Sequence, residues 1–355
     1  MRSIFAIGLG VLVTALALEA FLQCMPVVSG LRIEQSSEQR PYSRYLPQQE
    51  YVYSHGWALA NARHGKTNRQ GFTNSPDFKD DAAVLVIGDS FIESLMLEYP
   101  ETLQGQLNQA LGGGVYAASA SGNGFADALE VLRHTRAQLH PRTVVMFAAP
   151  MDMLDIRAPA QRGHSMFVSE GSNIKLVHVP YVEPKAKRLL AYSALARYIY
   201  YNLKFPDWLM SQLHRSPPAA AQDTVAGAPD ALRAAALEYY LTQLRALGGA
   251  GDTRIIFLVD ADRNMLYAPQ KAVPNWKAGD RAFFIQSAMR HGYQVVDMQP
   301  VFARHWEQQR ERMDFLPVDG HWNPVAHKLA AQQILPLLPA ASPGVPAPLR
   351  QVAGY

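Results

Sequence analysis

Two short stretches of the chain carry residue types that could together perform nucleophilic catalysis. The first, VLVIGDSFIES at 84–94, runs from apolar residues straight into a Gly-Asp-Ser turn that ends at Ser90. A serine hydroxyl is a weak nucleophile and needs a base that is itself oriented by a third group. The second stretch, PVDGHWNPVAH, supplies both, because Asp319 and His321 are separated by one residue and residues two apart in an extended loop point the same way. The sequence therefore predicts Ser90 as the nucleophile, His321 as the base and Asp319 as the carboxylate that orients the base.

Alternating apolar and helix-like segments predict the scaffold that positions these residues. Apolar runs typical of buried strands occur at 83–88, 114–120, 143–150, 253–260 and 293–298, and segments with helical spacing occur at 100–111, 125–139, 280–292 and 324–338. This alternation predicts an α/β fold with a doubly wound sheet of five parallel strands. Sites in such sheets form outside the carboxyl ends of the strands, where Ser90 follows its strand.

The N-terminal stretch from Ile4 to Leu22 is apolar except for Thr14 and Glu19. Its length suits a helix that spans a bilayer, and it also suits a long signal-peptide core with a weak cleavage site around Ser29. We expect an uncleaved anchor, with Glu19 near enough to the C-terminal end of the run to reach the membrane surface. The organisation predicted is an anchor or signal segment at 1–30, an irregular polar lead-in at 31–80, the catalytic domain at 81–338 and a disordered tail at 339–355.

The catalytic domain contains a helical insertion at 155–250. Its part at 189–213 is helical and aromatic, and the wide apolar face could pack on the domain or lie on a membrane surface. We expect packing on the domain, because few Lys or Arg residues line the opposite face. The composition of the following stretch, 214–230, predicts a flexible loop.

Composition argues against several classes of function. The formal charge of +3 is spread along the chain without a block of Lys or Arg, so a nucleic-acid partner is not expected. The histidines outside the second stretch, such as His55, His134 and His305, show no ligand pairing, and neither a metal nor another cofactor is expected. Cys24 is the only cysteine, which excludes an internal disulfide.

The combination of motifs resembles the SGNH or GDSL-type hydrolases over residues 50–340. The Gly-Asp-Ser turn matches the first block of that family, SASGNG at 119–124 matches the second, and Asp319 with His321 matches the last. The segment TNRQGFTNSPDF at 67–78 is similar to one that precedes the first block in membrane-anchored members. The resemblance implies a flavodoxin-like three-layer α/β/α fold and an oxyanion hole made by the N–H groups of Ser90 and Gly122, with the side chain of Asn123 as a further donor.

Two departures from the family pattern affect these expectations. The third block should supply an Asn side chain to the oxyanion, but Met151 stands there and only the following Asp152 remains. Loss of one oxyanion donor can cost about a hundredfold in rate. The second departure is the single residue between Asp319 and His321, where many members have two. The resulting form, Asp-Gly-His-Trp, is similar to that of alginate-type O-acetyltransferases and their relatives in exopolysaccharide modification. Those relatives act outside the inner membrane, which implies a single-pass inner-membrane protein with a periplasmic catalytic domain and polysaccharide-modification proteins as partners.

Three hypotheses about function follow from the motifs. The first is a serine esterase or acyltransferase for O-acetyl groups of envelope or exopolysaccharide carbohydrate. The second is a catalytically degenerate domain that binds a glycan or acts as a scaffold, since Met151 departs from the family. The third is a lipid-directed esterase, suggested by the aromatic segment at 189–213. The residues expected to line the substrate site are Asp89, Asp152, Arg263, Asn264 and Trp322.

Overall fold

The core of the protein is a parallel sheet of five strands. The computed structural model describes the chain except for residues 1, 80–81, 155, 157–158, 172, 214–230, 250–252, 271, 317–318 and 340–355. The strands are β3 (Val84–Gly88), β4 (Val115–Ser119), β5 (Thr143–Ala148), β8 (Arg254–Val259) and β9 (Gln294–Asp297), and they lie in the order β4-β3-β5-β8-β9. All neighbouring strands are parallel, and the order is that of flavodoxin-like folds. The predicted fold class is confirmed.

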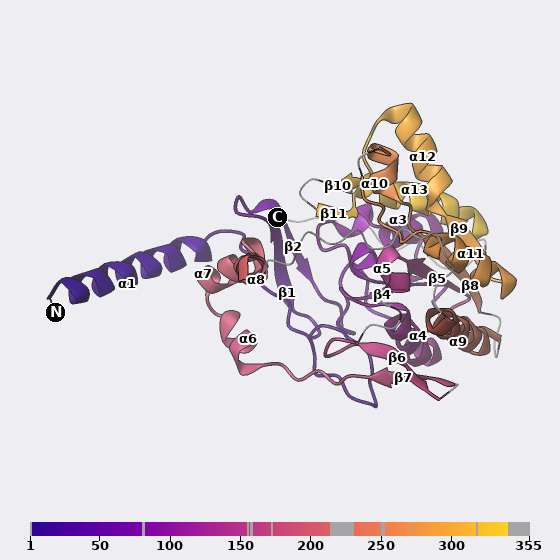
Figure 1. The fold of residues 1–355 in the computed structure, drawn as a ribbon, viewed down its shortest axis with the longest axis horizontal. Coiled ribbons are helices and arrows are strands. Elements are labelled where there is room, and N and C mark those ends of the chain that lie inside the picture. The colour runs from indigo at the N-terminus through magenta and orange to yellow at the C-terminus, as the bar shows by residue number, and fades with distance from the viewer. Residues whose placement is uncertain are drawn as a thin grey trace.

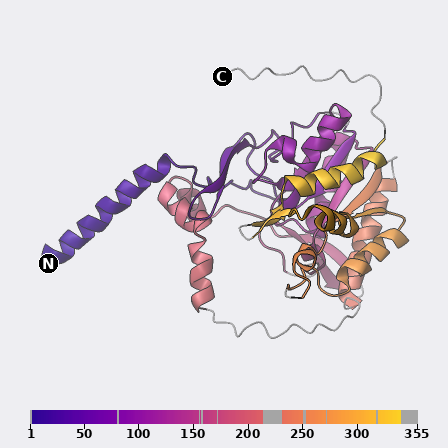
Figure 2. The same ribbon diagram turned by 90° about the horizontal axis from the view of Figure 1, so that it is seen from above.

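Helices cover both faces of this sheet (Figures 1 and 2). Both faces need to be covered because both are apolar, as strand β3 shows: alternate residues of a strand point to opposite faces of the sheet. Leu85 and Ile87 belong to one apolar cluster and Val84 and Val86 to the other, and all four are completely buried. The first cluster is closed by α4 (Phe125–Leu139), α9 (Ala231–Gly249) and α11 (Asp280–Arg290), and the second by α3 (Leu103–Leu111), α12 (Met298–Gln309) and α13 (Pro324–Ile334).

Short elements connect these layers. They are α2 (Ser90–Glu93), α5 (Pro150–Leu154), α10 (Arg263–Tyr267), the strand pair β10 (Asp314–Phe315) and β11 (Asp319–Trp322), and 3₁₀ turns at Tyr99–Glu101 and Leu335–Leu337. Three of them, α2, α10 and β11, begin at residues singled out by the sequence analysis.

The lead-in at 31–80 is not irregular throughout, so that prediction is wrong for residues 50–66. Strands β1 (Glu50–His55) and β2 (Ala60–Lys66) form an antiparallel hairpin there. Tyr51 pairs with Gly65, and its ring lies directly over that glycine, where a Cβ would be only 2.3 Å from the ring carbon that bears the hydroxyl. The polar residues of β2 hide the strand pattern because most of this strand faces solvent.

The insertion at 155–250 begins with a second hairpin that the sequence does not predict. It consists of β6 (Ser165–Glu170) and β7 (Asn173–His178), and α6 (Lys185–Leu190), α7 (Ala194–Arg197), a π-helical turn at Tyr198–Asn202 and α8 (Phe205–Leu213) follow. The expectation that the apolar face of 189–213 packs on the domain is wrong for much of it, since Tyr192 is 75% exposed and Trp208 is 55% exposed. The predicted loop at 214–230 lies outside the described residues, as does almost all of the predicted disordered tail.

Helix α1 (Arg2–Gln23) extends away from the rest of the chain (Figure 1). The stretch Ser3–Gln23 is long and apolar enough to cross a membrane, and its most apolar window is not buried against the protein. Both a membrane anchor and a signal sequence are compatible with this helix.

Candidate active site

Ser90 is delivered to the carboxyl edge of the sheet by a tight turn from β3 into α2. Gly88 ends the strand, and a Cβ there would lie 2.5 Å from Ile92, so only glycine lets α2 turn back this closely. Asp89 caps the new helix, because its Oδ1 accepts a hydrogen bond of 2.9 Å from the N–H of Phe91. Since β3 lies between β4 and β5, Ser90 occupies the point where the strand order reverses.

The side chains of Ser90, His321 and Asp319 form one hydrogen-bonded chain. The Nε2 atom of His321 is 2.8 Å from the Oγ atom of Ser90, and its Nδ1 atom is 2.5 Å from Oδ1 of Asp319. Both Asp319 and His321 lie on β11, and their two-residue spacing puts them on the same side of the strand, as the sequence predicts. Burial opposes ionisation of Asp319, but the hydrogen bonds and charge of His321 outweigh it and hold the pKa of that carboxyl well below its usual range. The ionised carboxylate fixes a proton on Nδ1, which leaves Nε2 able to accept the proton of the Ser90 hydroxyl.

Tyr53 on β1 is a residue of this site that sequence reasoning missed. Its hydroxyl donates a hydrogen bond of 3.0 Å to Oδ2 of Asp319, so both carboxylate oxygens are held. Burial and the neighbouring charge of Asp319 raise the pKa of Tyr53, which keeps the phenol protonated as a donor. No pattern in the sequence links a tyrosine of the polar lead-in to a carboxylate at the other end of the chain.

The oxyanion residues predicted from the sequence lie in the same pocket as Ser90. Gly122 has a φ of +82°, in the left-handed region that favours glycine, and both Gly122 and Asn123 line the pocket. The Nδ2 atom of Asn123 lies 3.4 Å from the carbonyl oxygen of Gly88, so its amide is directed at the end of β3. Met151, on α5, is 53% exposed and also lines the pocket.

The residues predicted to line the substrate site divide into two groups. Asp89, Asp152, Arg263 and Asn264 line the pocket, but Trp322 does not, and its prediction is wrong. Trp322 is completely buried, and its Nε1 donates a hydrogen bond of 2.8 Å to Asp260. The reason is the alternation of β11: a residue next to His321 points to the opposite side, into the core.

Arg263 reaches the pocket wall but makes its contacts with protein groups. Its guanidinium donates to Oδ2 of Asp314 at 3.1 Å, to Oδ2 of Asp260 at 3.2 Å and to the carbonyl oxygen of Gly320 at 2.8 Å. Gly320 lies between the two triad residues of β11, so Arg263 holds the strand that carries them. Only 2% of Arg263 is exposed. These contacts indicate a positioning residue rather than the substrate-binding residue that the sequence predicts.

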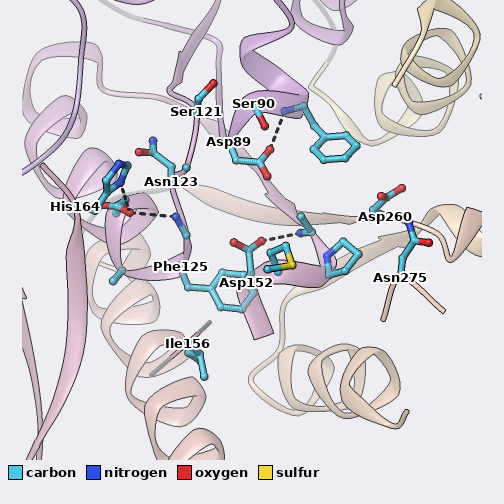
Figure 3. A pocket seen from close by; sticks show the side chains of 18 of the residues that line it. Asp89, Ser90, Ser121, Asn123, Phe125, Asp152, Ile156, His164, Asp260 and Asn275 are labelled. Atoms are coloured by element: carbon cyan, nitrogen blue, oxygen red, sulfur yellow. Dashed lines mark hydrogen bonds and ion pairs between the residues drawn. The ribbon is translucent and has the colours of Figure 1, made fainter. Parts of the chain in front are cut away.

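Two further residues predicted to line the pocket, Asp152 and Asn264, are held by the backbone. Oδ2 of Asp152 accepts a hydrogen bond of 2.6 Å from the N–H of Ala149, at the end of β5. Nδ2 of Asn264 donates one of 3.1 Å to the carbonyl oxygen of Val273. Both side chains are thereby fixed at the edge of the pocket, which has a volume of about 1100 Å³ and is drawn in Figure 3.

A second histidine–aspartate pair, which the sequence analysis did not find, also lines this pocket, and its histidine, His164, is labelled in Figure 3. Nδ1 of His164 lies 3.1 Å from Oδ2 of Asp127, and the same carboxylate accepts N–H groups of Gly124 and Ser165. The imidazole edge lies against Gly122, where a Cβ would be 3.3 Å away from it. Burial lowers the pKa of His164, but the hydrogen bond and charge of Asp127 raise it by a larger amount, so the net shift of this pKa is upward.

Buried carboxyl groups surround the nucleophile. Burial raises the pKa of Asp89 to about 6 and that of Glu93, on α2, to about 7. Glu93 is 1% exposed and accepts a hydrogen bond from the hydroxyl of Ser121, next to Gly122. In the part of the chain that the structure describes, no group of three or more His, Cys, Asp or Glu side chains is arranged to hold a metal ion.

Comparisons with known proteins give likenesses to solved structures only. No family model and no curated protein matches the sequence. An alpha/beta hydrolase from the metagenome of Lake Arreo is 16% identical with a TM-score of 0.40, and the match covers 73% of this chain and 95% of that one. An acetyl xylan esterase is 9% identical with a TM-score of 0.38, covering 72% and 98% of the two chains. The esterase EstA of a Pseudoalteromonas species is 14% identical with a TM-score of 0.32, covering 72% and 94%. Likenesses this low do not assign an activity, which has to come from the geometry of the chain's own site.

Proposed function

We propose that this chain is a serine esterase or acyltransferase that uses Ser90 as its nucleophile. The observation that carries the proposal is the hydrogen-bonded chain from Ser90 through His321 to Asp319, at the point where the strand order reverses. A serine hydroxyl elsewhere on a protein surface has no such base, and a histidine without a carboxylate has no fixed tautomer.

The residues support a two-step acyl transfer. The Oγ atom of Ser90 attacks the carbonyl carbon of an ester while Nε2 of His321 takes the hydroxyl proton. The N–H groups of Ser90 and Gly122 stabilise the oxyanion. When the intermediate collapses, the C–O bond of the ester breaks and the leaving alkoxide takes the proton from Nε2. Water or a sugar hydroxyl then gives its proton to Nε2 and attacks the acyl carbon. The bond from that carbon to Oγ of Ser90 breaks, and Oγ takes the proton back from Nε2, which completes hydrolysis or transfer.

The proposed substrate is an O-acetyl ester of a carbohydrate. The pocket lining is more apolar than polar, and its polar side chains include His164, Asp152 and Asn264, which can bind hydroxyl groups. His164 supports this assignment most directly, because Asp127 favours its protonated form and that form can donate a hydrogen bond to a substrate oxygen. The proposed location is the inner membrane, with α1 as the anchor and the catalytic domain in the periplasm among polysaccharide-modification proteins.

Covalent labelling tests the proposal. The full-length protein in detergent is treated with a fluorophosphonate, and the adduct is located by intact mass and peptide mapping. We expect one adduct on Ser90 that disappears in His321→Ala and persists in Ser121→Ala, a serine of the same pocket. A folded protein without an adduct would contradict the enzyme proposal, and Met151 would then favour the non-catalytic glycan-binding function.

Substrate preference is tested with matched esters. Release of acetate from acetylated polysaccharide, and faster cleavage of nitrophenyl acetate than of the decanoate ester, are the results expected. A preference for the long acyl chain would contradict the carbohydrate assignment and favour a lipid-directed esterase.

A further inference from the structure

The segment that runs from α6 to α8 carries large apolar side chains that are exposed on α6, on α8 and on the turns between the helices. Leu189 is 70% exposed, Tyr192 is 75% exposed, and Trp208 is 55% exposed. We call the set formed by these residues together with Tyr200, Phe205 and Met210 the platform. Phe205 and Trp208 have their ring centroids 5.5 Å apart. So many exposed aromatic and aliphatic side chains in one short segment are unusual for a surface that only meets water.

The platform is fixed to the C-terminal end of α1. Glu19, the only acidic residue of the apolar helix, accepts hydrogen bonds from the hydroxyl of Ser193 at 2.8 Å and from the N–H groups of Ala194 and Leu195, both at 2.9 Å. These donors form the beginning of α7, so Glu19 caps a helix of the insertion. An apolar cluster that includes Leu22 and Ala194 packs beside this cap. Figures 1 and 2 both show the insertion helices at the base of α1.

The length of α1 places this junction at a membrane surface. Its 22 residues span about 33 Å at the usual helical rise, close to the roughly 30 Å of a hydrocarbon core. Glu19 then lies where the helix leaves the bilayer, and its charge is satisfied by protein donors at that depth. Tyr and Trp side chains such as those of the platform are enriched at this level of a membrane. Lys185 and Arg188 are both exposed on α6, and Arg188 pairs with Glu183 at 3.4 Å. Cations close to a bilayer surface are attracted to anionic head groups.

We propose that α6, α7 and α8 lie on the bilayer surface and insert the platform side chains among the lipid head groups. This proposal rests on the membrane anchoring proposed above and extends it, because a spanning helix alone leaves the orientation of the attached domain open. With two contacts, one through the bilayer and one along its surface, the catalytic domain is held in one orientation relative to the membrane.

Spin labels at matched positions test the proposal. In full-length protein carrying Cys24→Ser, single cysteines are introduced by Met210→Cys on the platform, Met289→Cys on α11 and Val11→Cys in α1. Met210 and Met289 are a matched pair, 52% and 60% exposed. The labelled proteins are placed in nanodiscs of phosphatidylethanolamine and phosphatidylglycerol, and collision with oxygen is compared with collision with a water-soluble nickel chelate. Tyr192→Cys provides a second platform position.

We expect the oxygen-to-nickel ratio at positions 210 and 192 to be several-fold higher than at 289 and lower than at 11. The docking would be overturned, and the anchor left intact, if the oxygen-to-nickel ratio at the platform positions equalled that at position 289 while the ratio at position 11 was high. An aqueous ratio at position 11 as well would overturn the anchoring and the docking together. Platform labels shielded from both reagents would show that a protein surface covers the platform, which also overturns the proposal.

Discussion

Glu93 gives a prediction about stability that follows directly from its burial beneath the nucleophile. The substitution Glu93→Gln keeps the size of the side chain and an oxygen that can accept from the hydroxyl of Ser121. It removes the only proton that titrates at this position. Because burial raises the pKa of Glu93 from 4.5 to about 7, the folded protein holds this proton more tightly than the unfolded chain does.

The sign and size of the effect follow from linkage. A raised pKa in the folded state contributes stability that is fully present below pH 4.5 and is lost as the pH rises through about 7. A difference of roughly 2.5 units corresponds to about 3 kcal/mol of unfolding free energy, as an order of magnitude. We therefore expect Glu93→Gln to be more stable than the unmodified protein by up to about 3 kcal/mol near pH 8 and to lose most of that advantage near pH 5.

The assay is thermal unfolding of the full chain in detergent at both pH values. Glu38→Gln, at an exposed position of the lead-in, serves as the control and should follow the unmodified protein at each pH. An advantage of Glu93→Gln of the same size at both pH values would refute the reasoning, because the buried carboxyl would then not be titrating in this range.

Four further substitutions test other parts of the site. Tyr53→Phe removes a donor to an ionised carboxylate, worth about 1.5–3 kcal/mol, and we expect kcat/KM for ester cleavage to fall about tenfold or more while Tyr51→Phe retains activity. Arg263→Met leaves the buried carboxylate of Asp260 without its arginine, while Arg312 still pairs with Asp314, and we expect unfolding measurements to show a loss of about 3 kcal/mol; an unchanged stability would contradict the positioning role. His164→Gln should raise KM about tenfold with little change in kcat, and an unchanged KM would exclude it from substrate binding. Met151→Asn should raise kcat by about tenfold or more if the amide reaches the oxyanion, and a decrease would show that Met151 is needed as it stands.

The parallel sheet and the triad contacts could be predicted because their signals are local. Continuous apolar runs mark strands that are buried on both faces, and β3 and β5 show that pattern without interruption. Asp319 and His321 are two residues apart on one strand, so their shared side follows from geometry alone. The sheet topology then brings Ser90 to them.

The remaining contacts of the site depend on packing between distant segments. Tyr53 lies on one hairpin and His164 directly precedes another, and neither residue lies in a continuous apolar run like those of the sheet. Their partners, Asp319 and Asp127, belong to other segments of the chain. The prediction for Trp322 failed for a local reason rather than a long-range one. Its position next to His321 suggested the pocket, whereas strand alternation turned its side chain into the core.

The hairpin of β1 and β2 links the catalytic triad to the segment that follows the apolar helix α1, so the two parts are not structurally independent. Its Tyr53 touches the triad, while Val52 donates to the hydroxyl of Ser29, shortly after α1, at 2.8 Å. Ser54 accepts a hydrogen bond of 3.0 Å from Asn202 in the insertion that Glu19 caps. A trimmed protein that starts after Ser29 would keep Ser90 and His321 but lose a hydrogen bond that holds the strand carrying Tyr53. Low turnover of such a protein would then reflect the weakened support of Asp319 rather than an unsuitable substrate. A change of anchor during evolution would likewise alter the contacts that hold the triad.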